Sequence, residues 1–145
     1  ADTTLALASL HVDSLAGGQP TDVRFIRLAL DDAEGRRVSD NFYVIGNEEG
    51  NLMQLRSLPK VSLKTDVVRD GNRYDVTIAN ETDTPAMMIR LNLKAEDGEQ
   101  VLPVSYEDNY FHLMPGEKRT VRVEWNPADT RSLPTYVEIT GFNVK

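Results

Sequence analysis

Hydrophobic and polar residues alternate in short runs along most of the chain, and polar turns separate the runs. The clearest run is 72–82, in which Tyr74, Val76 and Ile78 occupy every second position. A period of two is typical of β-strands, whose successive side chains point to opposite faces. Because one face of each run is polar, we expect antiparallel sheets that are each packed on one side. The pattern predicts an all-β fold, an antiparallel β-sandwich of about eight strands.

Turn residues divide the chain into the predicted strands. These lie within residues 21–30, 36–45, 60–71, 72–82, 86–100, 101–118, 119–126 and 134–145. The first two are joined by the polar turn "DDAEG", which predicts a β-hairpin. Residues 46–59 are less regular and could hold one helical turn. We therefore expect one sandwich domain over residues 21–145, preceded by a lead-in, residues 1–20, that could add one edge strand.

The composition fits one globular domain and disfavours several kinds of partner. With 145 residues and no cysteine, the chain can bury a core, forms no disulfide and leaves the redox compartment open. Its net charge of −7 opposes binding to the phosphates of nucleic acids or of anionic membranes. No apolar run approaches the length of a membrane span, and residues 1–14 lack the features of a signal peptide. We expect no nucleic-acid or membrane partner, and a chain that is a mature protein or a fragment of a longer one.

Side chains that could carry catalysis or bind a metal are sparse or poorly spaced. The histidines, His11 and His112, lie far apart without zinc-site spacing, so we interpret both as structural or exposed. Two acidic clusters precede glycines in predicted turns, where capping of the backbone is favoured over calcium binding; they are Asp31, Asp32 and Glu34, and Glu96 and Asp97. With 23 acidic residues, a pair of carboxylates is no specific sign of glycosidic chemistry. The segment "NET" at residues 80–82 fits an N-glycosylation sequon as well as an ordinary turn. We predict no catalytic residue, no cofactor and no metal site.

Two stretches nearly repeat each other, "SDNFY" at residues 39–43 and "EDNYF" at residues 107–111. Each places Asp-Asn before two aromatic residues; the residues are Asp40, Asn41, Phe42 and Tyr43, and Asp108, Asn109, Tyr110 and Phe111. Adjacent residues of a strand point to opposite faces, so we expect one ring of each pair in the core and the other outside. The outward ring could be an edge residue, or part of a docking surface for a neighbouring domain or a sugar ring. The Asp-Asn pair could shape a bulge that orients the rings.

Together with two later segments, these stretches resemble the C-terminal immunoglobulin-like domain of glycoside hydrolase family 2 enzymes, in particular exo-β-D-glucosaminidases and β-mannosidases. The resemblance covers residues 21–145 and depends on three ordered sets. The sets are Ser39, Asp40, Asn41, Phe42 and Tyr43; Leu102, Pro103, Val104, Asp108, Asn109, Tyr110, Phe111, Pro115, Gly116 and Glu117; and Gly141, Phe142 and Asn143. Two positions depart from the family pattern, because Val44 replaces the usual Trp and Met114 replaces the frequent Leu. The missing aromatic at Val44 could have touched a neighbour or ligand, so we assign no sugar contact there.

The resemblance implies an immunoglobulin-like module of a larger enzyme. Parent enzymes of this family hydrolyse β-glycosides with two glutamates on a TIM barrel, which needs about 250 residues, so the barrel lies outside this chain. The implied role is a non-catalytic C-terminal β-sandwich that packs on the barrel and supports it. Its implied partners are the other domains of the same polypeptide, with weak carbohydrate contact allowed. On this interpretation the two Asp-Asn-aromatic stretches are matching structural corners of the sandwich.

Two other functions fit the same residues. A carbohydrate-binding module would expose coplanar rings, with Tyr43, Tyr110 or Trp125 as candidates. A free-standing immunoglobulin-like module would instead bind another protein. The sequence leaves the location open, and a periplasmic or secreted protein is expected if the parent is a bacterial polysaccharide-degrading enzyme.

Overall fold

The computed structural model describes residues 23–47 and 49–145 of the chain. The predicted lead-in, residues 1–20, and His11 therefore lie outside the described residues. The chain divides into two compact units, residues 1–57 and residues 58–145, and each is considered separately below.

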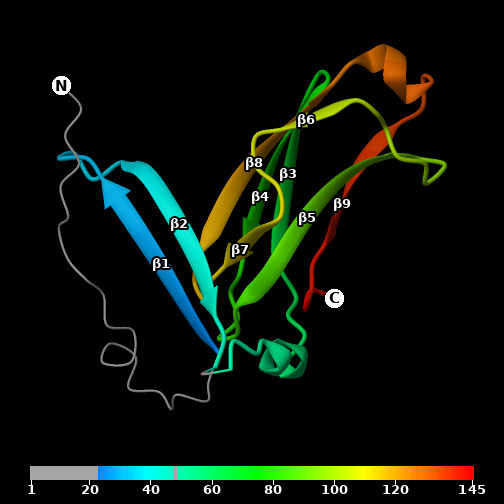
Figure 1. Cartoon of the computed structure of the whole chain (residues 1–145). Helices are drawn as coiled ribbons and strands as arrows, with labels where there is room; N and C mark the ends of the chain where they lie inside the picture. Colours follow the sequence, from blue (N-terminus) through cyan, green and yellow to red (C-terminus); the bar gives the residue numbers. More distant parts are fainter. Residues whose placement is uncertain (1–22, 48) are drawn as a thin grey trace. The chain divides into compact units, whose positions relative to one another are not determined.

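The described part of the first unit is a hairpin followed by a short helix (Figure 1). Strands β1 (Arg24–Asp31) and β2 (Arg37–Ile45) pair antiparallel, which confirms the predicted hairpin. Asp32 fixes the turn, because its Oδ1 accepts the N–H groups of Glu34 and Arg36 at 3.1 and 2.8 Å. The 3₁₀ helix η1 (Met53–Ser57) is the one helical turn expected in residues 46–59.

The second unit is a sandwich of two antiparallel sheets (Figure 1). In spatial order, the four-stranded sheet consists of β3 (Lys64–Asp70), β4 (Arg73–Ala79), β8 (Lys118–Trp125) and β6 (Val104–Tyr106). The three-stranded sheet consists of β7 (Phe111–Leu113), β5 (Ala86–Ala95) and β9 (Thr135–Thr140). A second 3₁₀ helix, η2 (Pro127–Thr130), follows β8. The predicted all-β sandwich is confirmed.

The core lies between these sheets and follows the alternation seen in the sequence. Tyr74, Val76 and Ile78 of β4 are buried, while the residues between them are partly exposed. Leu91 of β5, in the opposite sheet, belongs to the same hydrophobic cluster. Trp125 belongs to the same core, and its ring centroid lies 4.9 Å from that of Tyr74. Every buried member of this cluster belongs to residues 58–145.

Three features differ in detail from the sequence prediction. The described residues contain nine strands instead of about eight, because residues 101–118 hold two short strands, β6 and β7, instead of one. The pairing of β5 with β7 shifts register between Ala86 and Ile89. Both sheets of the sandwich lie within residues 58–145, while the predicted extent of the domain, residues 21–145, stays a prediction.

We expect a shortened chain of residues 58–145 to fold cooperatively by itself. It retains both sheets and every buried member of the core cluster, and these supply the apolar burial that drives folding. A single urea transition followed by Trp125 fluorescence would show this, with dispersed amide NMR signals as an independent check. A shortened chain that lacks a cooperative transition would contradict the prediction.

Candidate functional site

The first Asp-Asn-aromatic stretch lies inside β2 and is fixed by an arginine of β1. Asp40 forms an ion pair with Arg27 at 3.5 Å, and the Arg27 guanidinium lies 5.7 Å from the centroid of the Phe42 ring. These contacts occur because Arg27 is opposite Phe42 in the hairpin, so Asp40 lies on the same face. Tyr43 points to the other face and is 46% exposed. The two rings point to opposite faces as predicted, but Phe42 is only partly buried and lies outside the core cluster, so the predicted core ring is not found in this pair.

The second stretch forms the corner between β6 and β7 and uses a different arginine. Asp108 forms an ion pair with Arg119 of β8, whose guanidinium lies 5.0 Å from the centroid of the Phe111 ring. Phe111 is buried in the core, whereas Tyr110 is 55% exposed. The expected inward and outward rings are confirmed for this pair, and both stretches share a pattern in which one arginine contacts the Asp and a ring.

Asn109 and Tyr110 correct the interpretation of the Asp-Asn pair. Tyr110, and not the asparagine, adopts the left-handed backbone conformation, with φ of 60°. Asn109 instead extends the sheet with its side chain, because its Oδ1 accepts the Leu91 N–H at 2.9 Å and its Nδ2 donates to the Leu91 carbonyl at 3.0 Å. The interpretation of both stretches as matching corners is wrong for residues 39–43, since that stretch lies in the middle of a strand.

Pro115 and Gly116 form the turn that leads into β8. The Glu117 N–H donates to the Met114 carbonyl at 3.0 Å, and Gly116 has φ of 78°, as a type II turn requires at its third position. The turn is joined to Asn80, whose backbone carbonyl accepts the Gly116 N–H at 2.8 Å. Pro115 and Gly116, two residues of the family resemblance, therefore shape a turn of the fold.

The sequon at residues 80–82 is an internal turn. Asn80 is fully buried, and its Nδ2 donates to the carbonyls of Thr84 and Leu113 at 2.8 and 3.0 Å. A glycan would have to replace these bonds inside the sandwich, so the folded chain does not present this asparagine for modification. The turn interpretation is confirmed.

Asn143 joins three separate segments of the second unit. Its Oδ1 accepts the Met87 N–H at 2.9 Å, and its Nδ2 donates to the carbonyls of Pro59 and Pro85 at 3.0 and 2.8 Å. The side chain is 1% exposed, so these backbone groups depend on it for hydrogen bonds. The asparagine of the Gly-aromatic-Asn segment thus fastens the chain end to β5 and to the start of the second unit.

A polar network covers the outer face of the three-stranded sheet. Lys94 and Glu138 are 2.9 Å apart, and this hydrogen bond raises the pKa of the Lys94 ammonium and lowers the pKa of the Glu138 carboxyl. Asn92 is buried beside them and accepts a bond from Gln100 at 2.6 Å. These bonds give the network a structural role.

Tyr106 lies outside this network, in β6 of the other sheet. Burial raises its pKa, and its hydroxyl oxygen accepts the Leu93 N–H at 2.8 Å.

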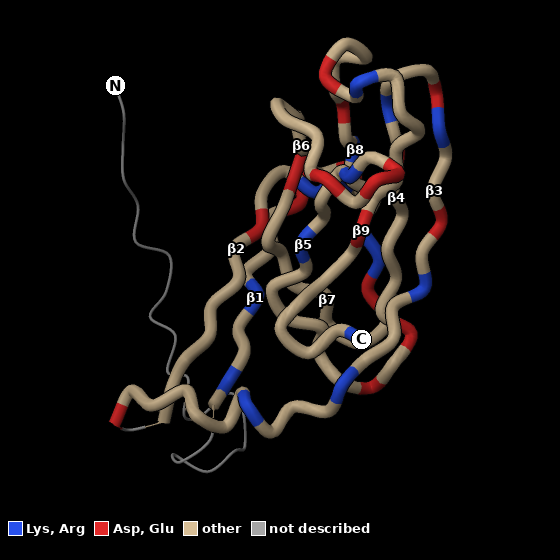
Figure 2. Tube along the Cα trace, turned by 90° about the vertical axis from the view of Figure 1, so that its right-hand side faces the viewer, with Lys and Arg blue, Asp and Glu red and all other residues tan. Residues whose placement is uncertain are grey.

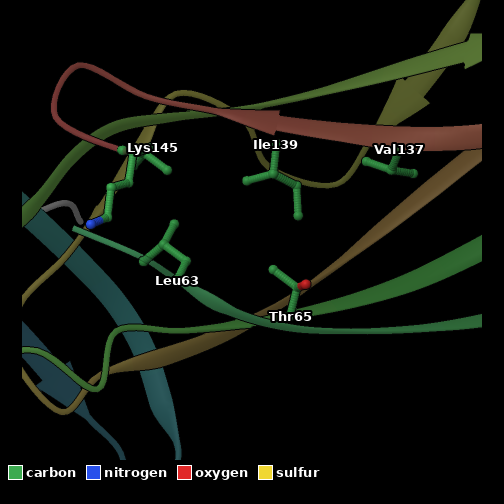
Figure 3. Close-up of a pocket in the computed structure, with 6 residues that line it drawn as sticks. Leu63, Thr65, Val137, Ile139 and Lys145 are labelled. Carbon is green, nitrogen blue, oxygen red and sulfur yellow. The ribbon is translucent and has the colours of Figure 1, made fainter. Parts of the chain in front are cut away.

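A pocket of about 230 Å³ opens between the edge strands β3 and β9 (Figure 3). Its lining is mainly aliphatic, with Leu63, Val137 and Ile139 pointing toward the opening, and Lys145 and Thr65 at its sides. The described residues that line it include no Asp or Glu side chain. Glycoside hydrolysis needs a pair of carboxylates across the scissile bond, so this pocket lacks the groups for that reaction.

Many charged side chains of the described residues form ion pairs or bond to turns. Acidic and basic positions are interspersed along the second unit (Figure 2). Glu107 and Glu124 share a shallow surface depression with Arg122, but both glutamates are exposed on the face of a sheet. The turn residue Asp97 accepts the Glu99 N–H at 3.0 Å and pairs with Arg131 at 2.8 Å. Within residues 23–47 and 49–145, no group of three His, Cys, Asp or Glu residues could hold a metal ion.

His112 and Trp125 are structural parts of the sandwich. His112 accepts the Met88 N–H on its Nδ1 at 3.0 Å, so its predicted structural role is confirmed. Trp125 is 5% exposed and cannot form the sugar-stacking platform considered from the sequence. None of the described helices has the length and apolar character of a membrane span.

The sequence did not reveal the partners of the two Asp-Asn-aromatic stretches. The charge of Arg27 and Arg119 did not indicate which residues they contact, because these contacts depend on which strands pair and in what register. The burial of Asn80 and Asn143 could not be predicted, because asparagine is usually exposed. The exposed left-handed residues Met88 and Tyr110 were also missed, since side chains of this kind rarely adopt positive φ.

Two facing antiparallel sheets with this core define a β-sandwich domain of immunoglobulin type. The chain belongs to the exo-β-D-glucosaminidase Ig-fold domain family, whose model matches residues 41–144.

Relatives and solved structures agree with this assignment. The chain is 31% identical over 166 aligned positions to an exo-β-D-glucosaminidase of Arthroderma benhamiae, covering 100% of this chain and 18% of that protein. It is 29% identical over 153 positions to an exo-β-D-glucosaminidase of Hypocrea virens, covering 88% of this chain and 17% of the relative. The crystal structure of Amycolatopsis orientalis exo-chitosanase CsxA has the same fold, with a TM-score of 0.71, 22% identity and coverage of 93% of this chain and 19% of that one. The chain thus spans less than a fifth of the length of these relatives.

Proposed function

We propose that this chain is the non-catalytic immunoglobulin-type domain of a longer β-glycosidase of the exo-β-D-glucosaminidase type. In that enzyme it packs on the catalytic barrel and supports it. The observation that carries the proposal is membership of the Ig-fold domain family together with the small share, 18%, of the Arthroderma benhamiae relative that the chain covers. Because the domain is a small part of a longer chain in its relatives, we expect its main contacts to be with the other domains of the same polypeptide.

The chemistry of the described residues supports a structural role. The stretches that carry the family resemblance are held by ion pairs, ring contacts and buried amides, and these groups satisfy one another. The pocket between β3 and β9 has no Asp or Glu side chain among its described lining residues. The acid and base that glycoside hydrolysis requires would therefore come from the missing barrel.

The proposal predicts a sharp difference in activity between two proteins. The purified chain should leave an aryl β-glucosaminide unhydrolysed, whereas the longer polypeptide from the same reading frame should hydrolyse it. Deleting residues 58–145 from the longer polypeptide should lower its melting temperature, because a supporting contact is lost. Turnover by the purified chain, or a reading frame without a barrel domain, would refute the proposal.

Calorimetric titration separates the alternatives. Chitosan oligosaccharides and mannan should release no heat with the purified chain if its role is structural. Saturable heat would instead identify a carbohydrate-binding module. A reading frame that encodes only similar β-sandwich repeats would identify a free-standing interaction protein.

A further inference from the structure

Two residues with large side chains have left-handed backbone in the second unit: Met88 lies within β5, and Tyr110 lies at the corner directly before β7. Met88 has φ of 53° and Tyr110 has φ of 60°, and the two are 48% and 55% exposed. Arg131 and Ser132 also have positive φ, but they lie in the connection between η2 and β9. Left-handed backbone is unfavourable for residues with a β-carbon, and strain of this kind persists where the surroundings enforce it.

Hydrogen bonds from neighbouring side chains hold both residues in place. The Met88 N–H donates to His112 Nδ1 at 3.0 Å, and the Tyr110 N–H donates to Asn109 Oδ1 at 3.1 Å. Asn109 is itself fixed by its two bonds to Leu91. The register shift in β5 thus buries Met87, which is 3% exposed, and turns the adjacent Met88 outward.

A third exposed apolar side chain lies near these two. Phe142 is 47% exposed, and its N–H donates to the Met87 carbonyl at 2.9 Å, which places it beside Met88. Ile89 is opposite Phe111 with both side chains in the core, so the outward residues Met88 and Tyr110 share the opposite face. We call Met88, Tyr110 and Phe142 the outer apolar patch.

Basic groups border this patch although the whole chain is acidic. Arg90 follows Ile89 on β5, on the outer face and toward Tyr110, while Lys60 Nζ donates to the Phe142 carbonyl at 3.0 Å. Glu138, the one carboxylate of β9, is already bonded to Lys94. In a chain of net charge −7, this border favours an acidic partner surface. It also opposes a protonated amino sugar, which carries positive charge.

We propose that the outer apolar patch is the surface by which this domain docks on another domain of the same polypeptide, at an apolar surface bordered by carboxylates. The inference rests on the proposed function. The occupant is argued from the relatives, of which the matched domain forms only 17–18%, and from the charge of the border. The docking contact would explain why Met88 and Tyr110 have strained backbone, because this backbone turns their side chains outward and docking would bury them.

Methionine oxidation tests the docking surface directly, because Met87 and Met88 are adjacent and differ in exposure. Dilute hydrogen peroxide converts an accessible thioether into the sulfoxide, and tandem mass spectrometry assigns the oxidised residue. In the purified chain, Met88 should react at least about tenfold faster than the buried Met87. In the longer polypeptide, Met88 should slow to nearly the rate of Met87. An equal Met88 rate in both proteins would overturn the inference.

Two matched substitutions test whether the outer apolar patch causes the protection of Met88 from oxidation. Tyr110→Asn tolerates left-handed backbone, so the purified chain should keep its melting temperature, whereas the longer polypeptide should show faster Met88 oxidation. Tyr136→Thr removes an exposed tyrosine from the other end of the same face and should leave Met88 protected in the longer polypeptide. Equal effects of the two substitutions would contradict the assignment.

Further controls exclude other occupants of the patch. Protection of Met88 in the purified chain by added chitosan oligosaccharides, or by raising the chain concentration, would overturn the proposal in favour of a sugar or a second copy. Hydrolysis of an aryl β-glucosaminide is measured on the same longer polypeptide. An active enzyme with an exposed Met88 refutes only the docking surface, whereas an inactive protein with a protected Met88 refutes only the proposed function.

Discussion

Replacing Asn143 with alanine is expected to lower the free energy of unfolding of the chain by at least about 3 kcal/mol. The substitution removes the acceptor of the Met87 N–H and the donor to the carbonyls of Pro59 and Pro85. Each buried group that loses its partner costs about 1–3 kcal/mol, and the site is 1% exposed, so water reaches these groups poorly. Urea denaturation followed by Trp125 fluorescence measures the loss.

Asn126→Ala is the matched control for this prediction. Asn126 is an exposed N-cap whose side chain accepts only the Ala128 N–H, at 3.0 Å, among its described bonds. Its removal should cost about 1 kcal/mol, as expected for a cap. Equal losses for the two variants would show that Asn143 does not join the three segments as described.

Replacing Leu93 with alanine is expected to cost about 2–5 kcal/mol of unfolding free energy. Leu93 is fully buried in the core between the two sheets, so the substitution removes apolar contact and leaves a cavity. Its backbone bonds to Tyr106 and Val101 do not involve the side chain and should persist. The change should therefore lower the urea midpoint of a fold that keeps its β-sheet circular dichroism.

Leu102→Ala provides the same chemical change at the surface of the same unit. Leu102 is 66% exposed, so its truncation should change the free energy of unfolding by no more than about 0.5 kcal/mol. If both variants unfold at the same urea concentration, the core does not lie where the two sheets place it.

The two Asp-Asn-aromatic stretches show how one short pattern serves two positions. In each, an arginine on a neighbouring strand contacts both the aspartate and a ring. The shared residues made them look equivalent, yet one stretch lies within β2 and the other forms a corner. The strand context, which differs between the two, leaves Phe42 partly exposed and buries Phe111 in the core.

Strand positions and fold class could be predicted because a period of two is a local property of the chain. The alternation of Tyr74, Val76 and Ile78 in the sequence is the alternation of burial in β4. The hairpin of β1 and β2 was likewise predictable, since its turn is encoded by adjacent residues such as Asp32. The division of the chain at residue 57 was not, because it depends on which strands share a core.

The order of residues alone predicts the strand pattern, the all-β class and the resemblance to one enzyme family. Which polar residues are buried, and which apolar residues are exposed, depends on how the strands pack together. Asn143 bonds to backbone groups 56 to 84 residues away, and no local pattern specifies partners at that distance. Met88 points outward because His112 and the shifted register of β5 hold its backbone. The burial of Asn143 and the exposure of Met88 are set when distant strands pack together, because the whole fold determines which groups are buried and which find hydrogen-bond partners.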